Sequence, residues 1–129
     1  METGGNLVMV ISKILIGLIA FEHLCIMWIE MFAWTTLGKK VFKVLPEDLF
    51  PKTKVMAANQ GLYNGFLSAG LIWSLFIKEY MWSNNVAIFF LSCVIIAGIY
   101  GSITVTKSVF FKQSLPAIIV MAVLFLKVL

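Results

Sequence analysis

Four long apolar segments follow one another along the chain, and each has the length of a membrane-crossing helix. They run from residue 7 to 32, 55 to 77, 86 to 104 and 113 to 129. About 20 predominantly apolar residues are enough for one helical crossing of the hydrocarbon core. The segments lack the alternation of polar and apolar residues that a transmembrane β-barrel requires. The pattern predicts an all-α fold, a polytopic transmembrane four-helix bundle forming a single domain over residues 1–129.

Polar residues gather in three connections between these segments. The longest, residues 33–54, contains five lysines and an acidic turn between Pro46 and Pro51. Its residues 41–45 are apolar enough to form a short helix at the membrane interface. Residues 78–85 form a short polar turn, and the third connection contains Lys107 and Lys112.

The lysine distribution predicts an orientation. The first and third connections together hold seven lysines, whereas the second holds only Lys78. Cytoplasmic loops carry an excess of Lys and Arg, so we expect both lysine-rich connections on the cytoplasmic side of a cell membrane and both termini outside.

Composition supports a membrane protein and excludes other classes. Hydrophobic residues make up 61% of the chain and charged residues 12%, and the mean hydropathy is +1.01. These values lie outside the range of soluble globular domains, so the lipid bilayer is the expected surrounding. The net charge of +4 comes from lysines that flank apolar segments, so we expect no nucleic-acid partner.

Motifs for catalysis, cofactors and processing are missing from the sequence. Cys25 and Cys93 fall within predicted helices and form no CxxC pair, so we expect neither a disulfide nor a metal pair. No nucleophile motif, phosphate loop or cofactor fingerprint is present, so we expect no cofactor and no metal, and catalytic residues stay unassigned. The first apolar segment has no basic residues ahead of it, which favours a retained helix over a signal peptide.

Polar residues inside the apolar segments gather at one level of the predicted bundle. With alternating helix directions, they all fall in the leaflet next to the lysine-rich connections. Intramembrane polar residues are costly and usually functional, so they predict a cytoplasm-facing polar pocket for a ligand. The predicted pocket residues are Glu22, His23, Glu30, Trp34, Asn59, Gln60, Tyr63, Asn64, Tyr100 and Gln113.

Helical phase and structural alternatives refine this hypothesis. His23 and Glu30 are seven residues apart and project from nearly one face, whereas Glu22 lies about 100° away from His23. Glu22 and Glu30 can instead be acids hydrogen-bonded between helices, and His23 can form a structural hydrogen bond. Asn59, Gln60 and Asn64 can likewise be interhelical contacts that each contribute about 0.6–2 kcal/mol.

Small residues recur every four positions in the second segment. Ala57, Gly61, Gly65 and Ala69 form a small-xxx-small ridge that lets another backbone approach closely. Packing within the chain is the first interpretation of this ridge, and a homodimer through it is the second.

Four short motifs resemble one known family. They are EMFAW at 30–34, NQGLYNG at 59–65, GIYG at 98–101 and QSLPA at 113–117. Together they resemble the small bacterial integral membrane proteins grouped as the domain of unknown function number thirteen hundred and four. The resemblance covers nearly the whole chain and implies a four-helix inner-membrane protein, without a reaction, substrate or partner. The residues that carry it are Glu30, Trp34, Asn59, Gln60, Tyr63, Asn64, Gly101, Gln113 and Pro116.

Three functions are compatible with this sequence. The first is binding or transport of a small amphipathic or lipid-like molecule in the polar pocket. The second is a structural or regulatory subunit whose polar row docks onto another membrane protein. The third is a membrane enzyme that uses a glutamate and His23 as acid and base on a lipid or quinone-like substrate.

Overall fold

A computed structural model describes the backbone of residues 2–128 and the side chains of residues 3–126. Met1 and Leu129, the ends of the predicted domain, lie outside these residues. The predicted all-helical class is confirmed, because residues 2–128 contain helices and connections but no strand. In chain order the elements are α1 (Glu2–Phe32), α2 (Leu37–Val41), α3 (Leu49–Lys52), α4 (Lys54–Phe76), α5 (Tyr80–Thr104), the π-helical turn η1 (Phe110–Ser114) and α6 (Leu115–Val128).

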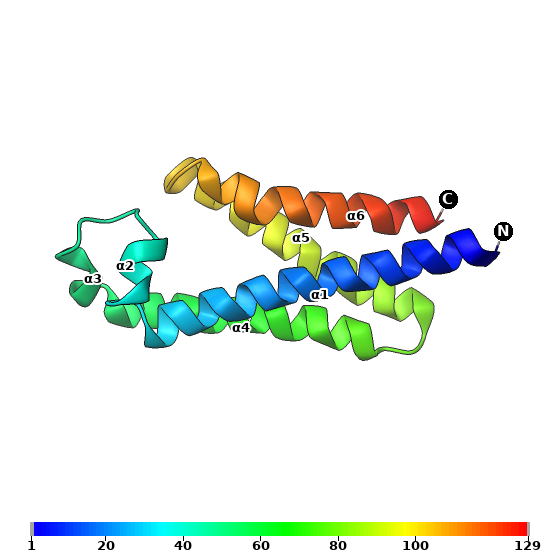
Figure 1. Cartoon of the computed structure of the whole chain (residues 1–129), viewed down its shortest axis with the longest axis horizontal. Coiled ribbons are helices and arrows are strands. Elements are labelled where there is room, and N and C mark those ends of the chain that lie inside the picture. Colours follow the sequence, from blue (N-terminus) through cyan, green and yellow to red (C-terminus); the bar gives the residue numbers. More distant parts are fainter. Residues whose placement is uncertain (1, 129) are drawn as a thin grey trace.

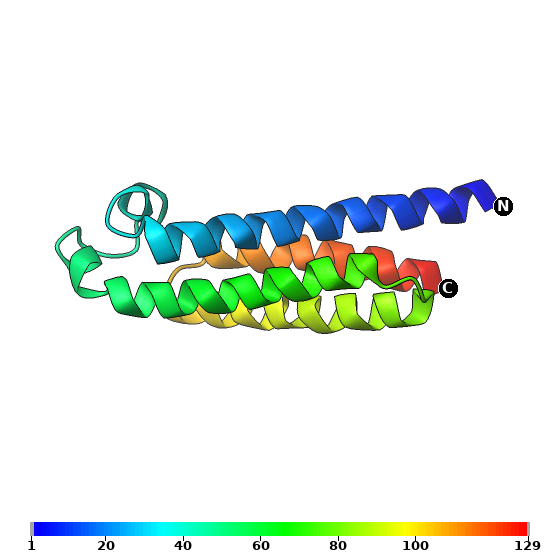
Figure 2. The same ribbon diagram turned by 90° about the horizontal axis from the view of Figure 1, so that it is seen from below.

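The long helices α1, α4, α5 and α6 lie side by side along the long axis of the molecule (Figures 1 and 2). Helix α1 packs against α4 and α6, and α5 packs against α4 and α6 as well. The connection containing α2 and α3 lies at the same end as the turn between α5 and η1 (Figure 1). The start of α1, the end of α6 and the α4–α5 turn lie at the opposite end.

Several helix boundaries differ from the predictions, and α1 already begins at Glu2, five residues before the apolar segment that starts at residue 7. Helix α5 begins at Tyr80, before the apolar segment starts at residue 86, because Glu79 caps it. The Glu79 carboxylate accepts hydrogen bonds from the backbone N–H groups of Met81 and Trp82, at 2.9 and 3.0 Å. The short helix expected at residues 41–45 instead occupies Leu37–Val41, and the chain leaves it at Phe42.

Within the part of the chain that the structure describes, two helices are long and apolar enough to cross a membrane. They are Thr3–Phe32 and Tyr80–Thr104, while Phe110–Leu126 is apolar but shorter. In the most apolar 18-residue stretch of each of these two helices, only 28% and 22% of the residues, respectively, are buried inside the protein. Most residues of these stretches are therefore exposed or only partly buried.

The packed apolar core lies in the middle of the four long helices. Its residues come from all four long helices and are less than 6% exposed. They are Ile16, Ile19, Ala20, Leu71, Ala87, Leu91, Val94, Ala117, Val120 and Leu124. None of these residues comes from the last two turns of α1 or α5, or from the first turns of α4, which lie nearest the lysine-rich connections.

Close approach of α1 to α4 depends on the glycines of the ridge. A Cβ atom on Gly61 would lie 2.9 Å from Glu30 Cβ and 3.1 Å from the Met27 carbonyl oxygen. A Cβ atom on Gly65 would lie 2.6 Å from the Met27 sulfur. The ridge is thus used for packing within the chain, and the homodimer through Ala57, Gly61, Gly65 and Ala69 stays a prediction.

Candidate functional site

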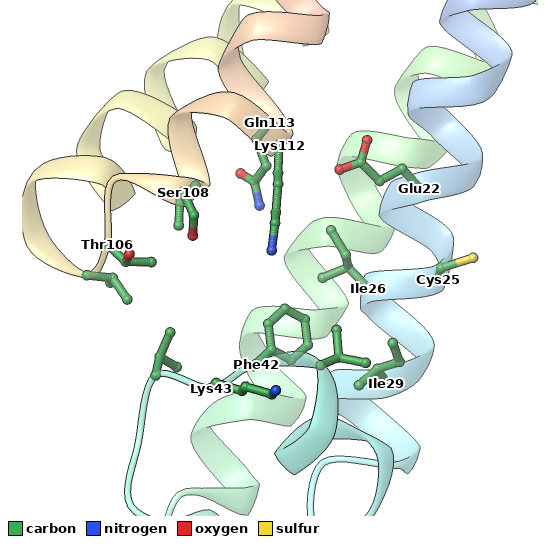
Figure 3. Close-up of a pocket in the computed structure, with 14 residues that line it drawn as sticks. Glu22, Cys25, Ile26, Ile29, Phe42, Lys43, Thr106, Ser108, Lys112 and Gln113 are labelled. Carbon is green, nitrogen blue, oxygen red and sulfur yellow. The ribbon is translucent and has the colours of Figure 1, made fainter.

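A cavity of about 620 Å³ lies at the lysine-rich end of the molecule (Figure 3). Three parts of the chain form its walls: the second half of α1, the end of α2 with the segment after it, and the turn from α5 into η1. The lining residues are Glu22, Cys25, Ile26, Ile29, Val41, Phe42, Lys43, Val44, Val105, Thr106, Ser108, Val109, Lys112 and Gln113.

The α1 wall follows from helical periodicity. Glu22, Ile26 and Ile29 are spaced by four and three residues, so their side chains stand one above another on one face. Cys25 borders the cavity, but its sulfur points away from it (Figure 3). The wall is therefore apolar except for the carboxyl group of Glu22.

The opposite wall depends on the π-helical turn η1. Ser114 Oγ donates a hydrogen bond to the Ile95 carbonyl at 2.8 Å, which ties the end of η1 to α5. Gly98 permits this approach, because a Cβ atom there would collide with Ser114 Oγ and lie 2.9 Å from the Ser114 backbone nitrogen. The turn leaves the side chains of Lys112 and Gln113 facing the cavity (Figure 3). Single π-helical turns inside helices occur often at functional sites.

Trp34 supports the third wall without lining the cavity. Its Nε1–H donates a hydrogen bond to Thr53 Oγ1 at 3.0 Å. Its ring packs against Phe50 at 4.8 Å and against Phe42 at 5.7 Å, measured between ring centroids. Phe42 in turn lines the cavity, so Trp34 positions the segment that carries Phe42 and Lys43.

The charged groups around the cavity are not paired with one another. Among the described residues, the ion pair formed is Lys52 with Asp48, at 3.9 Å outside the cavity. The described hydrogen bonds include none from the side chains of Glu22, Lys112 or Gln113. Glu22 projects from α1 toward the side of the cavity that carries Lys112 and Gln113, and Lys43 lies beside Phe42 (Figure 3). The site can thus present both charge signs to a ligand.

Glu30 and Asn64 form a second polar contact, between α1 and α4. Glu30 is only 6% exposed, and its Oε1 accepts a hydrogen bond from Asn64 Nδ2 at 3.1 Å. Asn64 Nδ2 also lies 3.3 Å from the carbonyl oxygen of Gln60 in its own helix. This pair joins the two helices, and neither residue lines the cavity.

His23 is buried and lies outside the cavity lining. Its side chain is 1% exposed, and Nδ1 donates a hydrogen bond to the Ile19 carbonyl at 2.9 Å. The Nε2 atom is buried without a hydrogen-bond partner. Glu22 and His23 are thus adjacent in sequence, but Glu22 lines the cavity and His23 is buried outside its lining.

Four of the predicted pocket residues lie on the outside of the protein. Tyr63 is 60% exposed and Tyr100 is 69% exposed. Asn59 and Gln60 are also exposed, and Asn59 Nδ2 donates to the Val55 carbonyl of its own helix at 2.9 Å. The structure does not bring these four residues to the cavity.

Of the ten predicted pocket residues, Glu22 and Gln113 line the cavity. Sequence reasoning missed Lys43, Lys112, Phe42 and Ser108. Both lysines lie in connections that flank apolar segments, where the positive-inside rule explains them without a binding site. For Lys112 there is one sequence signal, because it directly precedes Gln113, a predicted pocket residue.

Comparison with known proteins identifies relatives. The family model described as "Protein of unknown function (DUF1304)" matches residues 17–125. The matched stretch contains every residue that lines the cavity. The uncharacterized protein YpaA of Lactococcus lactis subsp. lactis (strain IL1403) is 30% identical over 112 residues, which cover 85% of this chain and 92% of that protein. No solved structure matches.

Proposed function

This chain belongs to the DUF1304 family of proteins of unknown function, and we propose that it is a multi-pass membrane protein that binds a small amphipathic or lipid-like molecule. The observation that carries the proposal is the cavity of about 620 Å³, whose apolar walls contain unpaired charged groups of both signs. Ligand pockets of about 300–1,000 Å³ with apolar walls and a few convergent polar groups are typical of small-molecule sites.

A four-helix transmembrane bundle is the arrangement we propose for α1, α4, α5 and the η1–α6 segment. The outward apolar faces of α1 and α5 support it, because so much exposed apolar surface is unfavourable in water. Helix α4 carries more polar groups, but it packs against both α1 and α5. Its Asn64 amide is paired with Glu30, which removes part of the cost of placing it in hydrocarbon.

The cavity is proposed to open toward the cytoplasm. It lies at the end that carries the seven lysines of the first and third connections, two of which line it. The positive-inside rule places such loops on the cytoplasmic side.

Binding is favoured over transport by a single chain. The core of ten buried apolar residues fills the middle of the four long helices, beyond the cavity. A ligand would have to separate these packed side chains in order to cross, and native cores are packed at about 0.74–0.76 density. Transport by this fold would therefore require a different arrangement of the helices.

A role as a subunit of a membrane complex is the second candidate. The exposed side chains of Asn59, Gln60 and Tyr63 on α4 favour it, because lipid offers amides no hydrogen-bond partner. An enzyme that uses Glu22 and His23 together is less favoured, because His23 does not line the cavity.

Filling the cavity tests the proposed function. We expect Ile26→Trp to weaken binding of a dansyl-labelled fatty acid by at least about tenfold, because the indole ring occupies the ligand's space. Ile96→Trp is the matched control, since Ile96 is 67% exposed on the outer face. Fluorescence titration in nanodiscs, with empty nanodiscs subtracted, measures both variants. Absence of saturable binding to the wild-type protein, or equal binding by both variants, would contradict the proposal.

A further inference from the structure

We propose that the cavity selects an amphiphile whose head group joins a phosphate-type anion to a primary ammonium group. This inference rests on the proposed function and names the chemistry of its ligand. It comes from the presence of Glu22, Lys43 and Lys112 around one cavity, with no ion pair among them.

The two lysines supply the anion site. Lys43 follows α2 and Lys112 lies in η1, so two separate parts of the chain bring ammonium groups to the same cavity. Like charges that share a site repel each other unless an anion lies between them. An ammonium group carries three donors, and a phosphate offers several oxygens to two such groups at once. Both lysines are exposed, which places the anion site at the mouth of the cavity.

Glu22 supplies the cation site. It is half-buried in the α1 wall, between apolar residues of its own helix face, and no lysine with a described side chain lies within ion-pair distance of it. A ligand with only negative charge would be repelled by a Glu22 carboxylate. A ligand ammonium group would instead neutralise it, and a charge removed from water needs such a partner.

The remaining lining residues fit the rest of an amphiphile. Gln113, Ser108 and Thr106 provide neutral donors and acceptors in the lining of the same cavity. The apolar lining accepts a hydrocarbon chain and consists of Ile26, Ile29, Val41, Phe42, Val44, Val105 and Val109. A head group with both charges can place its anion at the two lysines and its ammonium at Glu22, so that each ligand charge has a partner of opposite sign.

Displacement of the dansyl-labelled fatty acid from the full-length protein in nanodiscs tests the head group. Three competitors share one acyl chain: lysophosphatidylethanolamine with both charges, lysophosphatidic acid with phosphate alone, and monoacylglycerol with neither. We expect lysophosphatidylethanolamine to compete about tenfold better than each of the others, since a charged hydrogen-bonded contact has about that effect.

Two sets of variants test which residues contact the phosphate and which contact the ammonium of the head group. Glu22→Gln should bring lysophosphatidylethanolamine and lysophosphatidic acid within about twofold of each other. The double substitution Lys43→Met and Lys112→Met should weaken both phospholipids by about tenfold and leave monoacylglycerol unchanged. Glu47→Gln and Lys107→Met, in the same connections but outside the lining, are the matched controls and should behave as wild type.

The possible outcomes separate the two proposals. If all three amphiphiles compete equally, or if Glu22→Gln keeps the original preference, the head-group assignment is wrong while the amphiphile site stands. If none competes and the dansyl probe does not saturate, the proposed function itself is wrong. Phosphoethanolamine without an acyl chain is the final competitor. Competition equal to that of the lysophospholipid would support the head group and contradict an amphipathic ligand.

Discussion

At the scale of single residues, the amides of α4 have different surroundings although they are close in sequence. Asn64 Nδ2 donates to the buried carboxyl of Glu30 across the α1–α4 contact, at 3.1 Å. Asn59 Nδ2 donates only within its own helix, to the Val55 carbonyl, and is exposed. An amide that joins two helices contributes to stability, and one that returns to its own backbone contributes little.

Replacing Asn64 tests this difference. Asn64→Leu should lower the free energy of unfolding by about 1 kcal/mol, because Glu30 loses its interhelical donor while staying buried. Asn59→Leu, the same exchange on the same helix, should change it by less than about 0.5 kcal/mol. Unfolding by SDS titration in mixed micelles measures both variants. Equal effects at the two positions would show that the Glu30–Asn64 bond does not stabilise the helix pair.

At the scale of helices, the packing of α1 on α4 depends on the absence of side chains at the ridge. Gly61 is buried against Met27, Glu30 and Met31, and one of the close atoms is a backbone carbonyl oxygen. A backbone atom cannot move aside without moving its helix. The ridge therefore sets the separation of α1 from α4, and with it the position of Glu22 in the cavity wall.

Adding a methyl group at Gly61 tests the ridge. Gly61→Ala should destabilise the protein by about 1–3 kcal/mol through overpacking. Gly17→Ala is the matched control, since its new Cβ would meet only Leu75 Cδ1 at 4.0 Å. The control should gain up to about 1 kcal/mol, because alanine is the better helix former. Thermal unfolding in detergent measures both variants.

The same variant separates the two interpretations of the ridge. Light scattering should give Gly61→Ala the oligomeric state of the wild-type protein if the ridge packs within the chain. A well-folded variant that changes from dimer to monomer would instead show that the ridge lies between two copies.

At the scale of the whole molecule, the two ends have different characters. One end contains the lysine-rich connections and the cavity, and the other contains the start of α1 and the α4–α5 turn. A molecule with this asymmetry has one end suited to a charged, hydrated surface. We therefore expect a single orientation in the membrane.

Single cysteines test that orientation. In a background of Cys25→Ser and Cys93→Ser, we expect Glu47→Cys and Lys107→Cys to react with an impermeant maleimide only after cells are permeabilised. Lys78→Cys, in the turn at the opposite end, should react in intact cells. The reverse pattern would overturn the orientation, and labelling of Glu47→Cys and Lys107→Cys from opposite sides would contradict the proposed four crossings.

Much of the helical architecture could be predicted from the sequence, and less of the candidate site. The apolar segments match the observed helices closely, except that α1 begins early, at Glu2, and Glu79 starts α5 early. Glu22 and Gln113 were predicted as pocket residues and line the cavity. Phe42 and Lys43 could not be predicted, because the connection that carries them is positioned by Trp34, at a distance in sequence. Likewise, no local sequence pattern indicates the π-helical turn η1, which directs the side chains of Lys112 and Gln113 toward the cavity.

The sequence by itself determined that the chain is helical, where its apolar segments lie, and that its lysines cluster in two connections. Tertiary structure alone decided how each helix is rotated: Glu22 faces the cavity, His23 is buried beside it, and Tyr63 faces outward. The physical reason is that these helices are apolar on nearly all sides. A soluble helix reveals its buried face by its hydrophobic stripe, whereas a helix with apolar residues all round shows no such stripe. Its rotation is then set by close packing and a few interhelical hydrogen bonds, which only the assembled helices reveal.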